Sequence, residues 1–206
     1  MLKCMWSVVV PALLITITTG CQTAVPVSAY RMDPVAGAGD TSINVLQEAT
    51  DSRRKKSNQV GRHTFTIFMI PTIPVTSEDY LRKEVGEAFS TALKEAGYQV
   101  EVVEKVDQAD GPVLNVQIDS VRNYLFSWGW PIGLTGGWAK MTPVLFDNEG
   151  NVLWKGVPCT GWGGCPSLIY MAGFETSVSL EVSSVFRKIL EQMNTAEFKK
   201  ALQAKN

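Results

Sequence analysis

The sequence contains a single histidine, His63, and only four cysteines among its 206 residues. A Ser/His/Asp or Cys/His catalytic centre would have to use His63, which lies at the edge of a predicted strand after a basic loop. Zinc ligation is poorly supported as well, because Cys159 and Cys165 are separated by five residues and no second Cys or His pair accompanies them. We therefore expect no catalytic residue, no metal site and no cofactor.

An excess of charge of either sign is also missing. The 19 Lys and Arg residues nearly balance the 20 Asp and Glu residues, for a formal net charge of -1. Without an overall positive field, a nucleic-acid partner is not expected. The local exception is the basic run "SRRKK" at 52–56, which together with Arg62 is either a patch for acidic headgroups or an acidic partner, or a simple solvated loop.

Long hydrophobic runs are absent apart from a short one near the N-terminus. Lys3 precedes an apolar run at 5–17, and small residues follow as far as Gly20. This is the pattern of an export signal, and the run is too short to span a bilayer comfortably. Cys21 comes next, and the arrangement resembles a bacterial lipoprotein signal, in which this cysteine receives lipid. Thr18 stands where that motif usually has Leu, so a general secretory signal with Cys21 free is the alternative.

The lipoprotein resemblance has consequences for location and for the other cysteines. Gln22 follows the anchor in place of the Asp that marks retention at the inner membrane, which implies an outer-membrane lipoprotein, carrying palmitate or a similar acyl chain, that faces the periplasm. Cys4 would leave with the signal and Cys21 would be capped. In an oxidising compartment the remaining Cys159 and Cys165 predict a disulfide, which in the chain-entropy model contributes about 2 kcal/mol.

Composition divides the chain into three parts. Residues 1–20 are predicted to be the signal peptide, and residues 21–40, rich in Pro, Gly and Ala, a lipidated flexible tether. Residues 41–206 are predicted to form one periplasmic α+β domain.

Hydrophobic periodicity within 41–206 predicts both strands and helices. We predict strands at 41–49, 63–75, 98–106 and 112–126, a hairpin at 138–157 that turns at "DNEGN", and helices at 76–96, 176–193 and 195–204. Strands and helices mix without a repeated unit. The predicted fold class is therefore α+β, a single mixed, mostly antiparallel sheet with two main helices packed on one face.

Tryptophan is concentrated in one part of the chain. Two glycine-rich segments predicted as loops, "FSWGWPIGLTGGW" and "CTGWGGCPSLIY", hold Trp128, Trp130, Trp138 and Trp162. Either these loops fold over one another and cap the open face of the sheet, or they offer an apolar surface to a protein partner, a lipid or a glycan.

The order of short motifs carries a family resemblance. "DSR" at 51–53, "GY" at 97–98, "AD" at 109–110 and a closing helix from Thr176 together resemble small bacterial outer-membrane lipoproteins typified by YajG. The resemblance implies a fold like the N-terminal domain of TolB and a role as an accessory or assembly subunit of an envelope machine. It implies no catalytic residues, and the tryptophan-rich segment lies outside its pattern.

The sequence thus predicts a non-enzymatic, lipid-anchored envelope protein. As an accessory or structural subunit it would bind a protein partner through Trp128, Trp130, Trp138 and Trp162. The alternative is a periplasmic carrier of a small lipid or glycan ligand held under the same segments. An envelope hydrolase would need His63 or a pair of carboxylates, which the sequence does not favour.

Overall fold

The computed structural model describes residues 22–23, 41–53, 59–65, 70–77, 81–129, 132–167 and 170–203. The predicted signal peptide, Cys21, Trp130 and most of the predicted tether lie outside these residues. In the part of the chain that is described, no helix combines the length and apolar character needed to cross a membrane.

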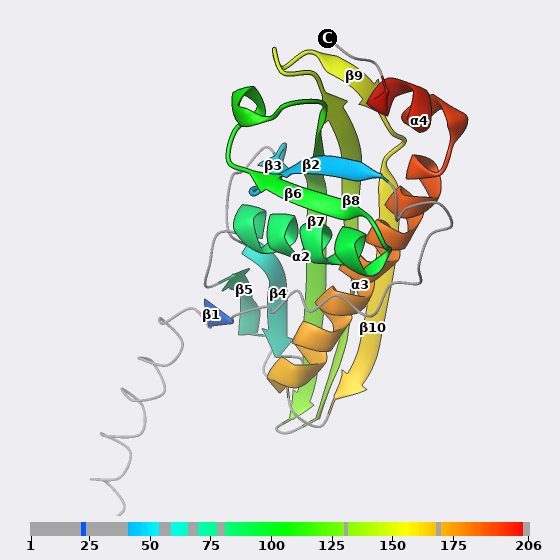
Figure 1. The fold of residues 1–206 in the computed structure, drawn as a ribbon. Helices are drawn as coiled ribbons and strands as arrows, with labels where there is room; N and C mark the ends of the chain where they lie inside the picture. Colours follow the sequence, from blue (N-terminus) through cyan, green and yellow to red (C-terminus); the bar gives the residue numbers. More distant parts are fainter. Residues whose placement is uncertain are drawn as a thin grey trace, which may run out of the picture.

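Ten strands of the described residues form one mixed sheet, accompanied by three α-helices and one 3-10 turn (Figure 1). The strands are β1 (Gln22–Thr23), β2 (Ser42–Leu46), β3 (Thr50–Asp51), β4 (Gln59–Phe65), β5 (Ile70–Ser77), β6 (Gln99–Val103), β7 (Val113–Gly129), β8 (Ile132–Phe146), β9 (Val152–Lys155) and β10 (Cys159–Ser167). The helices are α2 (Leu81–Glu95), α3 (Tyr170–Met193) and α4 (Ala196–Leu202), and η1 (Val106–Gln108) is the 3-10 turn.

Two long antiparallel strands, β7 and β8, form the centre of the sheet. On the far side of β8 lie β10 and β9, both antiparallel to it. On the far side of β7, the shorter strands β2, β3 and β4 pair with it in parallel, one after another along its length. The predicted α+β class with a mixed, mostly antiparallel sheet is confirmed, since the longest pairings are antiparallel.

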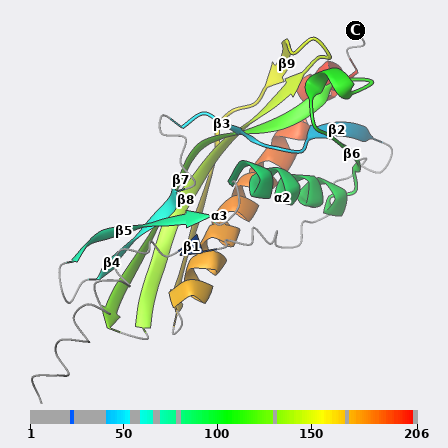
Figure 2. The ribbon, with the colours of Figure 1, turned by 90° about the vertical axis from the view of Figure 1, so that its left-hand side faces the viewer.

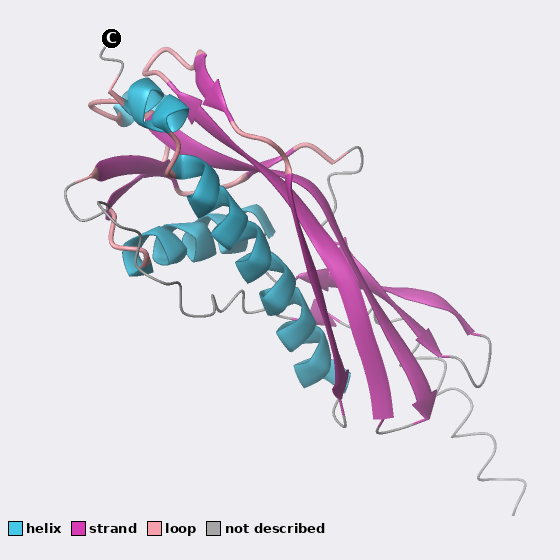
Figure 3. Cartoon of the chain, turned by 90° about the vertical axis from the view of Figure 1, so that its right-hand side faces the viewer, coloured by secondary structure: helices cyan, strands magenta, loops and turns pink. Residues whose placement is uncertain are grey.

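Helices α2 and α3 pack on the same face of the sheet, as predicted (Figures 2 and 3). Each carries an apolar stripe at helical spacing, and the two stripes meet where the rings of Phe89 and Phe186 lie 5.2 Å apart. Both phenylalanines are almost fully buried. The core therefore lies between this pair of helices and the inner face of β7 and β8.

Where they are described, the glycine-rich segments are strands and not loops, which corrects the sequence prediction. Gly161 and Gly163 lie on β10, where α3 crosses the strand. A Cβ atom at Gly161 would collide with the carbonyl oxygen of Glu181, and one at Gly163 with that of Ser177. Glycine is required here because the backbone of the helix packs directly on the strand.

The predicted Cys159–Cys165 disulfide is wrong, because both residues lie on the single extended strand β10. Their register partners on β8 are Met141 and Thr135. At about 3.3 Å per residue this separates the two Cα atoms by about 20 Å, whereas a disulfide needs about 7 Å or less. Cys159 is a buried free thiol whose sulfur accepts a hydrogen bond from Gln192 Nε2 at 2.9 Å.

The N-terminal half differs from prediction at two places. The predicted strand at 63–75 is divided between β4 and β5, and Pro71 and Pro74 lie within β5, where pairing on the outer side is limited to the two residues of β1. Gln22 and Thr23, predicted to belong to the tether, pair with Thr76 and Ser77 of β5. Thr76 is thus a strand residue and not the predicted start of a helix.

Candidate functional site

The side chains of β7 alternate between the helix-covered face and the opposite face of the sheet. Asn123 and Leu125 face α3 and are buried, at 1% exposure each. Arg122 and Phe126 lie on the opposite face, where Phe126 is 39% exposed. We call this opposite side of β7, β8 and β10 the outer face.

Aromatic rings form a continuous row across the outer face. The ring of Tyr124 lies 6.2 Å from that of Phe126 and 6.0 Å from that of Trp138. Trp138 in turn lies 5.4 Å from Trp162, its direct register partner on β10. Trp162 is 67% exposed and Leu134, on β8, is 55% exposed. The outer face thus presents a large apolar surface to solvent.

The structure brings together only some of the tryptophans that were predicted to bind a partner. Trp138 and Trp162 are neighbours on the outer face. Trp128 lies on β7, but its side chain is not among the described ones, and Trp130 lies outside the described residues. Trp154 belongs elsewhere, since its ring packs edge-on against Phe198 of α4 at 4.9 Å.

Arginine side chains border the aromatic row. Arg122 faces Trp138 across the β7/β8 pairing, and its guanidinium carbon lies 5.9 Å from the centre of the indole ring. At this distance the positive charge is attracted to the face of the indole ring. Arg62, which the sequence analysis grouped with the basic run, lies on β4 beside Tyr124. Both arginines are exposed.

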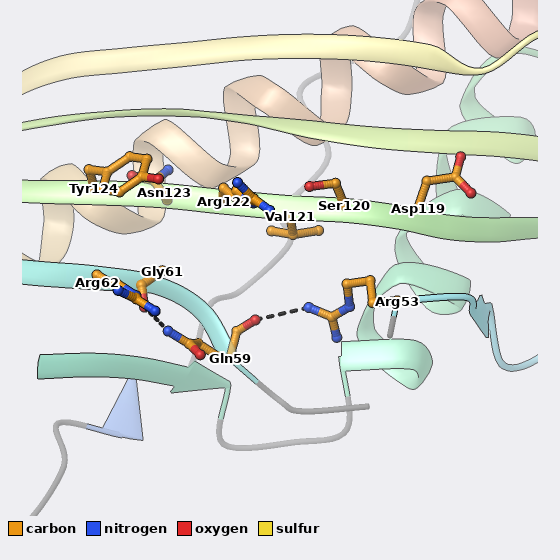
Figure 4. A pocket seen from close by; sticks show the side chains of 10 residues that line it. All are labelled: Arg53, Gln59, Gly61, Arg62, Asp119, Ser120, Val121, Arg122, Asn123 and Tyr124. Atoms are coloured by element: carbon orange, nitrogen blue, oxygen red, sulfur yellow. Dashed lines mark hydrogen bonds between the residues drawn. The ribbon is translucent and has the colours of Figure 1, made fainter. Parts of the chain in front are cut away.

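A cavity of about 620 Å³ lies where β4 separates from β7. Figure 4 shows its lining residues along two neighbouring strands, with Gln59 and Arg53 at the point of separation. The lining residues are Arg53, Gln59, Gly61, Arg62, Asp119, Ser120, Val121, Arg122, Asn123 and Tyr124. Arg122 and Tyr124 belong both to this cavity and to the outer face, so the two features are continuous.

On the other side of the sheet, a buried carboxyl group lies behind the cavity. Glu181 of α3 is fully buried, and its Oε1 accepts hydrogen bonds from Asn123 Nδ2 at 2.7 Å and from Ser177 Oγ at 3.3 Å. Burial raises the pKa of Glu181 to about 8, and the hydrogen bond from Ser177 offsets only part of that shift. At neutral pH this carboxyl group is protonated and therefore uncharged. This fits a buried group whose role is to make hydrogen bonds within the protein.

Sequence reasoning missed Glu181, although a signal exists. The residue falls between Val178 and Val185, three and four positions away, and therefore lies in the apolar stripe of the helix. A lone carboxylate in such a stripe indicates a buried acid.

Candidate metal ligands are not clustered. Among the described side chains, no group of three or more His, Cys, Asp or Glu residues is arranged to hold a metal ion. His63 lies on β4, but its side chain is not among those described.

No protein-family model matches the sequence, and neither does any curated protein. Among solved structures, a Xanthomonas campestris protein of the DUF330 family is similar at a TM-score of 0.55 and 10% identity, over 84% of this chain and 94% of that one. An uncharacterised protein follows at a TM-score of 0.49 and 7% identity, over 84% and 97% of the two chains. Lipoprotein GNA1162 from Neisseria meningitidis has a TM-score of 0.33 and 16% identity, over 73% and 99%.

At these identities the comparisons show fold alone, and of the three structures named the Xanthomonas protein has the TM-score that supports this statement. This chain shares its α+β architecture with the DUF330 protein. The narrower resemblance to YajG-like lipoproteins stays a prediction.

Proposed function

We propose that this protein is a lipid-anchored bacterial envelope protein that acts by binding and not by catalysis. Cys21 carries the lipid, the domain faces the periplasm from the outer membrane, and the outer face of the sheet docks a partner protein. In this role the protein is an accessory or structural subunit of an envelope assembly.

The observation that carries the proposal is the exposed row of apolar side chains on the outer face. Trp162 and Leu134 are more than half exposed, although both lie on strands whose opposite face packs against the core. Contiguous exposed apolar surface marks interaction sites, and Trp and Tyr dominate binding hot spots. Because these rings lie on paired strands, little conformational entropy is lost when they are covered.

The partner is expected to have an apolar centre and an acidic rim. Arg122 and Lys140 are exposed on the same face as Trp138, and neither makes an ion pair with another described residue. Opposite charges at the rim of the partner would match them and speed association.

The lipid anchor is tested by metabolic labelling with an alkynyl palmitate analogue. We expect label on the wild-type protein and none on Cys21→Ser, which should also leave the membrane fraction. An unlabelled wild-type protein would contradict the anchor.

The docking surface is tested by purifying tagged protein from gently solubilised envelopes. We expect Trp162→Ala to lose a stoichiometric partner that the wild type retains, although the variant stays folded. The matched control is Val157→Ala, which truncates a side chain that is 71% exposed but lies outside the outer face. If both variants retain the partner equally, the outer face is not the docking surface.

A second function, carriage of a small lipid or glycan ligand, is supported by the cavity beside Tyr124. Its volume of about 620 Å³ lies within the range of small-molecule sites. Native mass spectrometry of the purified protein should then show a bound adduct, and a spectrum of the bare polypeptide would count against carriage.

A further inference from the structure

We propose that the cavity between β4 and β7 binds the phosphate group of an organic phosphate. Arg62 and Arg122 hold the phosphate oxygens, and Tyr124 supports the organic part of the ligand. This inference names the ligand class of the second function above and does not depend on the docking of a protein partner.

The cavity lies beside a stretch of β7 that is not paired on one edge by any described strand. On that edge β3 pairs with β7 as far as Ile118, and β4 begins to pair with it at Asn123. Between these residues no described strand pairs with that edge. The cavity lies along this stretch, so one of its walls is the strand β7.

Arg53 closes one end of the cavity and is already neutralised. Its Nε and Nη2 donate to the two carboxylate oxygens of Asp51 at 2.9 and 2.7 Å. Its Nη1 donates to the carbonyl oxygen of Gln59 at 2.9 Å, as Figure 4 shows. This bidentate pair fixes Arg53 as a structural part of the wall.

Asp119 is the one carboxylate among the described lining residues, and both of its oxygens accept hydrogen bonds from the protein. Its Oδ1 accepts from Ser52 Oγ at 3.1 Å and from Gln117 Nε2 at 2.8 Å. Its Oδ2 accepts from Thr142 Oγ1 at 2.6 Å. Asp119 and Tyr124 lie at opposite ends of the lining stretch of β7 (Figure 4). An anion therefore favours the end near Tyr124, away from this negative charge.

Two arginines without a carboxylate partner lie toward that end. Arg62 is the register partner of Tyr124, and Arg122 is two residues before Tyr124 on β7. Neither makes an ion pair within the described residues. Two guanidinium groups offer two planar donor forks, which match the several oxygens of a phosphate better than the two oxygens of a carboxylate.

The aromatic neighbours point to an organic phosphate and not to the free ion. Tyr124 lines the cavity and contacts Phe126 and Trp138 on the outer face. A ring or an apolar group attached to the phosphate can lie against these side chains. The volume of about 620 Å³ leaves room for such a group.

The test is isothermal titration calorimetry on the detergent-solubilised full-length protein. The probes are inorganic phosphate, glucose 1-phosphate as a sugar phosphate, glycerol 1-phosphate as a lipid headgroup, and glucuronate as a carboxylate. We expect at least one organic phosphate to bind about tenfold more tightly than inorganic phosphate or glucuronate, a gain of about 1.4 kcal/mol. The organic phosphate that binds more tightly shows whether the ligand is a sugar phosphate or a lipid headgroup.

Substitutions assign the binding to the two arginines. Arg62→Gln and Arg122→Gln should each lower the affinity for the organic phosphate by about tenfold or more, and Arg62→Lys should lower it less. Lys140→Gln removes an exposed cation of the outer face that does not line the cavity, and should have no effect. Trp162→Ala should leave phosphate binding intact while abolishing partner docking, which separates the two proposals.

Three results would overturn the inference. They are equal affinity in wild type and in the Arg62→Gln/Arg122→Gln double variant, equal affinity for glucuronate and the organic phosphates, and no binding of any phosphate at millimolar concentration. An empty native mass spectrum alongside tight phosphate binding would reject carriage in the cell but keep the site.

Discussion

Among single residues, Glu181 has the most unusual environment. It is fully buried between α3 and the sheet. Among the described residues its Oε2 has no hydrogen-bond partner, and its shortest hydrogen bond comes from Asn123. Removing a carboxylate from water disfavours the charged form, which is why its pKa rises to about 8. The folded protein therefore holds a proton on Glu181 at pH values where the same side chain in the unfolded chain has lost it.

The first prediction concerns the pH dependence of folding. An unfolded glutamate titrates near pH 4.3, whereas the folded Glu181 titrates near 8. Between these values the folded state holds one more proton than the unfolded state. The free energy of unfolding should therefore fall by up to about 1.4 kcal/mol per pH unit as the pH rises through this window.

Glu181→Gln provides the matched control, because it keeps the shape and the hydrogen bonding but cannot ionise. We expect the stability of wild type, relative to Glu181→Gln, to decrease steadily from pH 5 to pH 8 in urea unfolding experiments. A constant difference between the two proteins over this range would show that Glu181 is not titrating as described.

At the same scale, sequence reasoning singles out residues that differ from their immediate neighbours. Arg62 is one of them, and the structure places it beside the cavity. The lipidation of Cys21 stays a prediction. Arg122 and Asn123 do not stand out in the sequence. They become part of the cavity only because β4, from a distant part of the chain, pairs with β7, with Gly61 opposite Asn123. The cavity could not be predicted for this reason.

At the scale of elements, periodicity predicted the helices and most strands because each pattern is local. The hairpin turn at Gly150, which has a φ of 86°, is one such case. The glycine-rich segment of β10 was predicted as a loop because glycine weakens strand propensity. Its glycines are explained by the close approach of α3, a contact that no local pattern reveals.

Two tryptophans on neighbouring elements should respond differently to truncation. Trp154 on β9 packs against Phe198 and the core, whereas Trp162 on β10 is 67% exposed. We expect Trp154→Ala to lower the free energy of unfolding by about 3 kcal/mol, and Trp162→Ala by less than about 1 kcal/mol. Chemical denaturation of both variants measures this contrast. Similar losses would mean that Trp162 belongs to the core.

The course of β10 also predicts the redox state of the protein. Cys159 and Cys165 should both react with iodoacetamide in denaturant without reductant, since an extended strand keeps them apart. Cys159, at 5% exposure, should react slowly in the folded protein. Intact-mass measurement counts the added groups. If the two cysteines were labelled only after reduction, they would be joined by a disulfide, and β10 could not be extended as described.

At the scale of the whole molecule, the sheet divides the protein into a core side and an outer side. The helices cover the inner face, and the outer face carries the aromatic row and leads into the arginine-lined cavity (Figures 2 and 4). The DUF330 protein from Xanthomonas shares this architecture, so the fold itself does not specify the partner. Any partner must therefore be specified by side chains of the surface.

The most direct test of the central claim is site-specific photocrosslinking in living cells. A benzoylphenylalanine residue replaces Trp162 or Leu134 on the outer face, or Val152 or Val157, which are equally exposed elsewhere. Docking through the outer face predicts a discrete crosslinked partner from positions 162 and 134 and none from 152 and 157. Crosslinks from the second pair alone, or from neither pair, would contradict it.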